Sequence, residues 1–244
     1  MLQMGIIEKI KAEDRDAKDW ASPIVLVPKP DSSTRLCVNF RKVNKYTDAD
    51  PFPLPRIEDL VERVGRAKFL TKIDMTRGYW QVPLDDVFVP ISAFVTPEGL
   101  FRWKYMPFWL KNAPATLSRL VAKLLQGLEM FRSAYLDDII IFSDTWYEHL
   151  DHIKQVFDRI RNAGITLNKR KCEFAAAELD YLGHHVGLGK VEPKRQKVKA
   201  ISDFPEPSNP FTASPVTTGS TFRTTQRCPQ SYQICSRREQ SSLN

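Results

Sequence analysis

Short β-rich runs alternate with longer stretches of helical spacing along most of this chain. The run PIVLVPKP (23–30) is bounded by prolines, and RLCVNF (35–40) follows it after a few turn-forming residues. This pattern predicts a β-hairpin that carries Lys29 and Arg35 near its ends. Further along, Glu98-Gly99 separates two more apolar runs, which predicts a second hairpin.

Three segments have a helical pattern. A short helix is expected at about 56–64, after a connector rich in proline. A second helix begins at Ala113, where apolar residues recur at spacings of three and four as far as Leu128. A third runs from Trp146 until Asn162-Ala163-Gly164 ends it. The alternation of these helices with antiparallel hairpins predicts an α+β fold with helices on one face of a sheet.

Two adjacent aspartates interrupt an apolar hairpin at 130–143, and a third aspartate ends the apolar strand KFLTKID (68–74). Neighbouring side chains of a flat strand point to opposite faces, so at least one of Asp137 and Asp138 would be buried at high cost. A tight turn with cations on the carboxylates removes this cost. An isolated Asp-Asp pair is more often ordinary turn chemistry, but Asp74 adds a third carboxylate that could converge on the same point. Three such oxygen ligands suit a pair of Mg²⁺ ions.

Charge and composition add weaker evidence. The net charge is +7; residues 1–151 carry 21 Lys and Arg against 21 Asp and Glu, whereas residues 152–200 carry 11 against 5. A basic face would suit polyanions, although charge alone favours an ordinary solvated surface. The spacing of the four cysteines does not match a zinc site, and the first residues are too charged for a secretory signal. No apolar run reaches the roughly 20 residues that span a bilayer. An intracellular location is expected.

Eight sequence blocks in a fixed order carry a family resemblance. The chain resembles the reverse transcriptase of gypsy-type long-terminal-repeat retrotransposons over nearly all of residues 5–208. The blocks are WASPIVLVPKPD (20–31), RLCVNFRKVNK (35–45), PFPLPRIEDL (51–60), IDMTRGYWQVPL (73–84), MPFWLKNAPAT (106–116), YLDDIIIFS (135–143), AGITLNKRKCEF (163–174) and YLGHHV (181–186).

The resemblance implies a right-hand polymerase, with fingers and palm in residues 20–190. The fingers would comprise about 20–45 and 85–113. Residues 1–19 would be a truncated lead-in, and 191–210 the start of the thumb or connection. The parent polyprotein of this family also carries ribonuclease H.

The family also implies roles for individual residues. Asp74, Asp137 and Asp138 would be the catalytic metal ligands, assisted by the main-chain carbonyl of Met75, and Lys171 would protonate the departing pyrophosphate. Tyr79 would be a steric gate against a ribose 2′-hydroxyl, although by itself it is more simply a core aromatic. The residues expected to bind the incoming nucleotide are Lys29, Arg35, Arg77, Gly78 and Tyr79, and those of the primer grip are Leu182, Gly183 and His184.

The implied activity is RNA-directed DNA polymerase, in which a primer 3′-hydroxyl attacks the α-phosphate of a dNTP on an RNA or DNA template. The cofactor would be two Mg²⁺ ions, with Mn²⁺ as a possible substitute. The protein would reside in a cytoplasmic particle or the nucleus, without a membrane partner. The sequence does not indicate its oligomeric state. His149 and His152 are spaced as a metal pair, but no third ligand is evident. Histidines at the surface or partly packed are therefore favoured over a metal site.

The sequence departs from the family in several places, one of which is Val89-Pro90-Ile91 in place of a more polar stretch. Trp109 replaces a glycine in the turn beside the nucleotide pocket, so overpacking or blockage is expected. Asn39 replaces an aspartate. Residues 211–244 turn to Ser, Thr, Gln and Arg and are expected to be disordered. Within them PVTTGSTFRTT (215–225), back-translated with permitted codons and read in another frame, gives GYYRKYVPNY. Because that string resembles a family segment downstream of the palm, we interpret the tail as frame-shifted.

These departures leave the function open between two main hypotheses. The intact aspartates favour a polymerase. Trp109 and an incomplete thumb favour a catalytically dead fragment that binds nucleic acid through residues 152–200. A nucleotide cyclase on a related palm would explain the carboxylates but not the blocks of the fingers.

Overall fold

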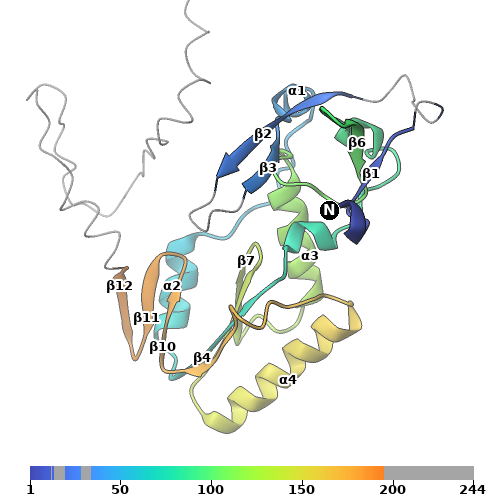
Figure 1. Ribbon diagram of the computed structural model, residues 1–244. Helices are drawn as coiled ribbons and strands as arrows, with labels where there is room; N and C mark the ends of the chain where they lie inside the picture. The colour runs from blue at the N-terminus through green and yellow to red at the C-terminus, as the bar shows by residue number, and fades with distance from the viewer. Residues whose placement is uncertain (12, 14–19, 29–33, 195–244) are drawn as a thin grey trace, which may run out of the picture. The chain divides into compact units, whose positions relative to one another are not determined.

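The structure is a computed structural model that describes residues 1–11, 13, 20–28 and 34–194 (Figure 1). This part of the chain forms three β-sheets with helices packed against them. None of its helices has the length and apolar character needed to cross a membrane. The predicted tail at 211–244 lies outside the described residues.

The first sheet has five strands and contains both predicted N-terminal hairpins. Its strand order is β1 (Ile7–Lys9), β6 (Gly99–Trp103), β5 (Phe94–Thr96), β2 (Ser22–Pro28) and β3 (Thr34–Val38). The pairs β2–β3 and β5–β6 are antiparallel, as expected, whereas β2 and β5 run parallel. Strand β1 was not predicted. Four short helical elements lie outside the strands of this sheet: η1 (Leu2–Met4), α1 (Arg41–Lys45), η3 (Gly78–Gln81) and η4 (Pro90–Ser92).

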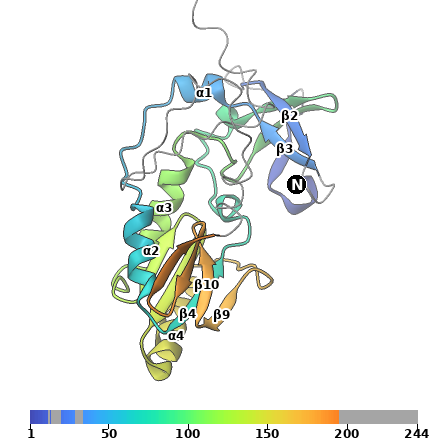
Figure 2. The same cartoon turned by 90° about the vertical axis from the view of Figure 1, so that its left-hand side faces the viewer.

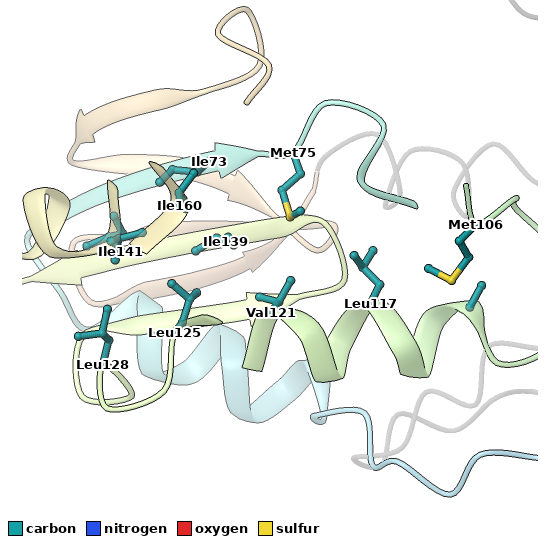
Figure 3. Close-up of a cluster of buried hydrophobic side chains, with 12 residues drawn as sticks. Ile73, Met75, Met106, Leu117, Val121, Leu125, Leu128, Ile139, Ile141 and Ile160 are labelled. Atoms are coloured by element: carbon teal, nitrogen blue, oxygen red, sulfur yellow. The ribbon is translucent and has the colours of Figure 1, made fainter. Parts of the chain in front are cut away.

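The second sheet is antiparallel and holds the predicted carboxylate hairpin. Its strand order is β7 (Arg132–Tyr135), β8 (Asp138–Ser143), β4 (Phe69–Asp74) and β9 (Glu173–Ala176). One face packs against α3 (Ala113–Leu124) and α4 (Trp146–Asn162) through a shared apolar cluster. Figure 3 shows side chains of β4, β8, α3 and α4 meeting there. The predicted helices on one face of the sheet are therefore present.

The opposite face of the second sheet is covered as well. Helix α2 (Ile57–Gly65) buries its apolar side against Leu70 of β4 and Ile140 of β8. The third sheet joins the same cluster, and α2 lies beside it (Figure 2). Its strands are β10 (Glu178–Tyr181), β11 (His184–Gly187) and β12 (Lys190–Pro193). The second sheet is thus enclosed on both faces, which holds its strand ends firmly in place.

The end of α3 differs from the expected pattern. The helical spacing continues to Leu128, but the helix stops at Leu124. Gly127 has φ 86°, in the left-handed region, and this turn redirects the chain. Leu125 and Leu128 are still buried in the core, because the turned chain continues along the same apolar cluster. The helical spacing therefore predicted correctly that Leu125 and Leu128 are buried, but the helix ends before them.

Candidate active site

The pairing of β4 with β8 brings two aspartates side by side. Asp74 is the last residue of β4 and Asp138 the first of β8, and the two are direct partners in the antiparallel register. Asp137 lies in the turn before β8, and its carbonyl accepts a hydrogen bond from the Met75 N–H at 3.1 Å. Opposite residues of an antiparallel pair have Cβ atoms about 5 Å apart. The main chain therefore gathers three aspartates at one end of the sheet.

A close approach between two backbone segments positions Asp137. Leu136, immediately before it, has φ 55° in the left-handed region, which makes the hairpin turn tight. Gly78 is buried against this turn, and a Cβ added at Gly78 would lie 3.2 Å from the Asp137 Cβ. A side chain at position 78 would therefore require the Asp137 turn to shift by a few tenths of an ångström.

Two lysine ammonium groups lie beside the carboxylates. Lys171 Nζ is 3.3 Å from Asp74 Oδ2, and Lys72 Nζ is 3.9 Å from Asp138 Oδ1. Burial raises the pKa of Asp138; Lys72 opposes that shift, while the negative charges of Asp137 and Asp74 add to it. Three carboxylates and two ammonium groups leave a formal charge of −1 (2 − 3). Partly buried excess negative charge of this kind favours binding of additional cations.

The carboxylates have suitable chemistry for a metal but do not yet surround one point. Within the described ranges, no three Asp, Glu, His or Cys side chains stand as a group that could hold a metal ion. Hard oxygen donors nevertheless fit Mg²⁺ or Mn²⁺, and the main chain already fixes their strand positions. The Lys171 side chain is 65% exposed, so its ammonium group can move into water and leave its place beside Asp74, whose side chain is only 12% exposed, to another cation. Rearrangement of side chains alone could therefore open this site to cations.

Three of the predicted nucleotide-binding residues follow β4 directly. The Tyr79 ring is half-buried, with its centroid 4.9 Å from that of Phe108. Burial raises the pKa of Tyr79, and the charge of Asp137 raises it further. The Arg77 guanidinium lies over the Trp80 ring at 5.1 Å. The structure thus brings Arg77, Gly78 and Tyr79 to the end of the sheet that carries the aspartates.

Of the other two predicted nucleotide-binding residues, only Arg35 is described, and it belongs to another sheet. Arg35 is exposed on β3, in the five-stranded sheet. Lys29 lies outside the described residues. Their contact with a triphosphate therefore stays a prediction.

The predicted primer grip is the turn between β10 and β11. Leu182 and Gly183 both have left-handed φ angles, 47° and 82°, and Tyr181 pairs with His184 across the turn. The Tyr181 side chain is fully buried and shares a hydrogen bond with Ser133 Oγ of β7 at 3.3 Å. Burial raises its pKa to about 12. The turn is therefore anchored to the strand that leads into the aspartate hairpin.

His149 and His152 belong to a buried hydrogen-bonded cluster. The two ring nitrogens of His149 lie 2.8 Å from Thr71 Oγ1 and 2.9 Å from Ser143 Oγ. His152 Nδ1 lies 2.8 Å from the same Ser143 hydroxyl, and its ring stacks on Phe131. His149 is 0% exposed, which is a deeper position than the expected surface or partly packed one. Both residues thus join α4 to the second sheet.

Comparison with known proteins identifies the family. Residues 27–186 match the family described as reverse transcriptase (RNA-dependent DNA polymerase). The chain belongs to this family. The match covers the carboxylate hairpin, β4 and the turn between β10 and β11, so every described site residue named above lies within it.

Relatives of this reverse transcriptase family include polyproteins of mobile elements. The retrovirus-related Pol polyprotein from transposon 297 of Drosophila melanogaster is 36% identical over 214 residues, which is 85% of this chain and 20% of that protein. The corresponding polyprotein from transposon 412 is 32% identical over 212 residues, 84% of this chain and 17% of that protein. The chain thus spans a fifth or less of the length of these relatives. The resemblance to gypsy-type reverse transcriptases is confirmed.

Solved structures of the family support the fold. The foamy viral protease-reverse transcriptase in complex with double-stranded DNA has a TM-score of 0.76 and 25% identity, over 84% of this chain and 35% of that one. Its complex with an RNA/DNA hybrid gives a TM-score of 0.74, over 84% of this chain and 27% of that one. The expected α+β fingers-and-palm fold is confirmed.

Trp109, which stands where the family resemblance implies glycine, has an unusual backbone conformation. Its φ is 76°, in the left-handed region that a side chain other than glycine adopts at a cost, and its ring is 52% exposed. Overpacking of the interior is therefore not what this tryptophan causes. Asn39 Oδ1 accepts hydrogen bonds from the Arg41 main-chain N–H and Nε, a pairing that an aspartate could also make.

Sequence reasoning missed Lys72 as a member of this reverse transcriptase site. It stands in the middle of the apolar run KFLTKID, and its neighbours in space lie far along the chain. The alternation of side chains along the strand could have indicated its importance. A lysine at an interior strand position requires a partner for its charge, and an aspartate near a strand end is a natural one.

Proposed function

We propose that this chain is the RNA-directed DNA polymerase domain of a retrotransposon Pol polyprotein, copying an RNA or DNA template from a primer. The observation that carries the proposal is the direct pairing of Asp74 with Asp138, with Asp137 in the adjoining turn. This arrangement lies in a chain of the reverse transcriptase family, whose members generally use divalent metals.

The proposed chemistry is nucleotidyl transfer from a dNTP to a primer 3′-hydroxyl. The carboxylates of Asp74, Asp137 and Asp138, with the Met75 carbonyl, would hold two Mg²⁺ ions. Such ions supply charge stabilisation for the attacking and leaving oxygens. Lys171 stands 3.3 Å from Asp74, close enough to donate its proton to a departing pyrophosphate bound there. Tyr79, beside Asp137, would exclude a ribose 2′-hydroxyl.

Nucleic acid is the proposed partner. The foamy viral relatives were solved with double-stranded DNA and with an RNA/DNA hybrid. In this chain the excess of 11 Lys and Arg over 5 Asp and Glu in residues 152–200 supplies a charge suited to a phosphate backbone. The turn at 182–184 would support the primer end, because Tyr181 ties it to the strand that leads into the aspartate hairpin.

Primer extension on a poly-rA template with an oligo-dT primer tests this function. The wild-type chain is expected to add dTMP in Mg²⁺, and Asp137→Asn to lose that activity. Asp144→Asn is the matched control, since Asp144 is an exposed aspartate just after β8, and it should extend the primer normally. Absence of extension in the wild type, together with salt-sensitive binding to the duplex, would instead support the second candidate function, a non-catalytic nucleic-acid binder.

The strained backbone conformation of Trp109 is the observation that favours this second candidate. Its effects on stability and on primer extension can be measured with a substitution. Trp109→Gly is expected to stabilise the fold by about 1 kcal/mol, because glycine adopts φ 76° without strain. The melting temperature should rise by roughly 2–4 °C. Primer extension should also rise if the ring blocks nucleotide or template.

Trp109→Ala separates the two effects of the tryptophan. It removes the ring but keeps the strained backbone, so it should show no gain in stability. Equal melting temperatures for the glycine and alanine variants would contradict an origin in backbone strain.

A further inference from the structure

Lys72 occupies a position where lysine is uncommon. It lies in β4, between Thr71 and Ile73, both of which are fully buried, and its own side chain is only 19% exposed. Strand β4 is an interior strand of its sheet, flanked by β8 and β9. A charged side chain held in such a place must find partners in the protein, because few water molecules can reach it.

The Lys72 ammonium group has partners on two different strands. Nζ donates a hydrogen bond to the Asp180 carbonyl of β10 at 3.2 Å. The same atom lies 3.9 Å from Asp138 Oδ1, at the start of β8. Asp138 and Asp180 come from different sheets, and they lie 66 and 108 residues along the chain from Lys72. One partly buried cation therefore bridges the aspartate hairpin and the strand that precedes the turn at 182–184.

We propose that Lys72 is a positioning residue that fixes the aspartate hairpin relative to the primer-holding turn. The inference rests on the proposed function, because it assigns the two bridged segments to metal binding and primer support. Asp138 would be held at a constant place relative to β10, and β10 runs through Tyr181 directly into Leu182. The 3′ end of a primer and the reacting carboxylates would then keep one spacing during synthesis.

Its environment distinguishes Lys72 from the other cation of the site. The Lys171 side chain is 65% exposed and contacts Asp74 alone among the carboxylates, so it can swing away. Lys72 is confined between strands and also donates to a main-chain carbonyl, which gives it a fixed direction. An ammonium group has three donors and can serve both partners at once. Methionine would fill a similar volume without any of these interactions, whereas arginine could still donate to two acceptors.

The test compares Lys72→Met, Lys72→Arg and the control Lys68→Met. Lys68 is an exposed lysine just before β4, so its replacement should leave every measurement unchanged. For Lys72→Met the kcat of primer extension should fall by about tenfold or more, since small misplacements of reacting groups have effects of this order. The KM for dTTP should stay within about twofold of the wild-type value. Lys72→Arg should recover part of the lost kcat.

Hydrogen–deuterium exchange supplies a readout that does not depend on activity. Amides of residues 178–186 should exchange faster in Lys72→Met than in the wild type or in Lys68→Met, because β10 has lost its tie to the second sheet. Unchanged kcat, or unchanged exchange in 178–186, would overturn the proposal. So would an equal loss of kcat in Lys72→Arg and Lys72→Met accompanied by equal drops in melting temperature, since that pattern belongs to a merely structural residue.

The two proposals fail in different ways. If the wild type extends primers and Lys72→Met does so equally well, the positioning role is wrong and the polymerase function stands. If the wild type does not extend primers, the polymerase function fails together with the positioning role. Exchange in 178–186 then still shows whether Lys72 joins the two sheets.

Discussion

Asp138→Asn is expected to abolish DNA synthesis and, at the same time, to make the folded protein more stable. Activity should fall by at least about 10³-fold, because asparagine keeps the shape of the side chain but lacks the negative charge that divalent cations require. The gain in stability has a separate cause. Burial and the neighbouring charges of Asp137 and Asp74 raise the pKa of Asp138, so folding favours its protonated form.

The sign of the pH dependence follows from that shift. A raised folded-state pKa means that ionisation of Asp138 destabilises the fold at neutral pH. Asparagine cannot ionise, so the variant should melt at a higher temperature than the wild type at pH 7. The advantage should vanish as the pH falls below the unfolded-state value of about 3.9, where both states of the wild type are protonated. Thermal unfolding without divalent cations, at several pH values, measures this.

Asp144→Asn again serves as the control, because its side chain is exposed and remote from like charges of the hairpin. It should alter neither primer extension nor the melting temperature at pH 7. An Asp138→Asn variant that melts at a lower temperature than the wild type at pH 7 would contradict the electrostatic account, even if its activity were lost.

His149→Ala is expected to destabilise the fold by about 3 kcal/mol. The substitution leaves a void in the core and removes one hydrogen-bond partner from each of two buried hydroxyls, Thr71 Oγ1 and Ser143 Oγ. Thr71 also accepts a hydrogen bond from the Ala175 N–H, so the loss weakens the contact of β4 with β9. The melting temperature should fall by roughly 6–12 °C.

The effect of this substitution should also depend on pH. Burial lowers the pKa of His149, and the charge of His152 lowers it further, so the folded protein holds the ring neutral. The unfolded chain binds a proton below about 6.5, and wild-type stability therefore falls as the pH drops through that value. The difference between wild type and His149→Ala should shrink between pH 7.5 and pH 5.

His185→Ala is the comparison for this second prediction. His185 is exposed and its pKa is raised by Asp180 and then Glu178, so it contributes stability on the acidic side and loses it as the pH rises. Its replacement should have a much smaller effect, with the opposite trend in pH. Similar pH trends for the two alanine variants would contradict the assignment of a buried neutral His149.

Much of this fold could be predicted from local sequence patterns. The apolar runs around Asp74 and Asp138 identified the strands, because alternation and strand ends are properties of a few neighbouring residues. The same runs placed three aspartates at strand ends, where the structure brings them to one end of the second sheet. The end of α4 was predicted from Asn162-Ala163-Gly164. Its start is explained by Thr145, whose hydroxyl accepts a hydrogen bond from the Glu148 N–H.

Interactions across long sequence separations could not be predicted in the same way. Strand β1 has three residues and depends on pairing with β6, more than ninety positions away. In the local sequence Lys72 is simply one polar position in a strand. Only the register of β4 and β8 places its ammonium group beside Asp138. His149 has an ordinary helical spacing, while its partner Thr71 lies 78 residues earlier, on a strand of another layer.

The turn at Trp109 is held in place by asparagine side chains rather than by its own sequence. Asn44 donates to the Trp109 carbonyl at 2.8 Å and accepts from the Lys111 N–H at 2.8 Å, while Asn112 bonds to the main chain of Asp48 and Asp50. The left-handed path is therefore fixed by neighbouring side chains, at a position where the family resemblance implies glycine. Tryptophan has the single codon TGG and GGG encodes glycine, so one base change would supply a residue that fits this backbone.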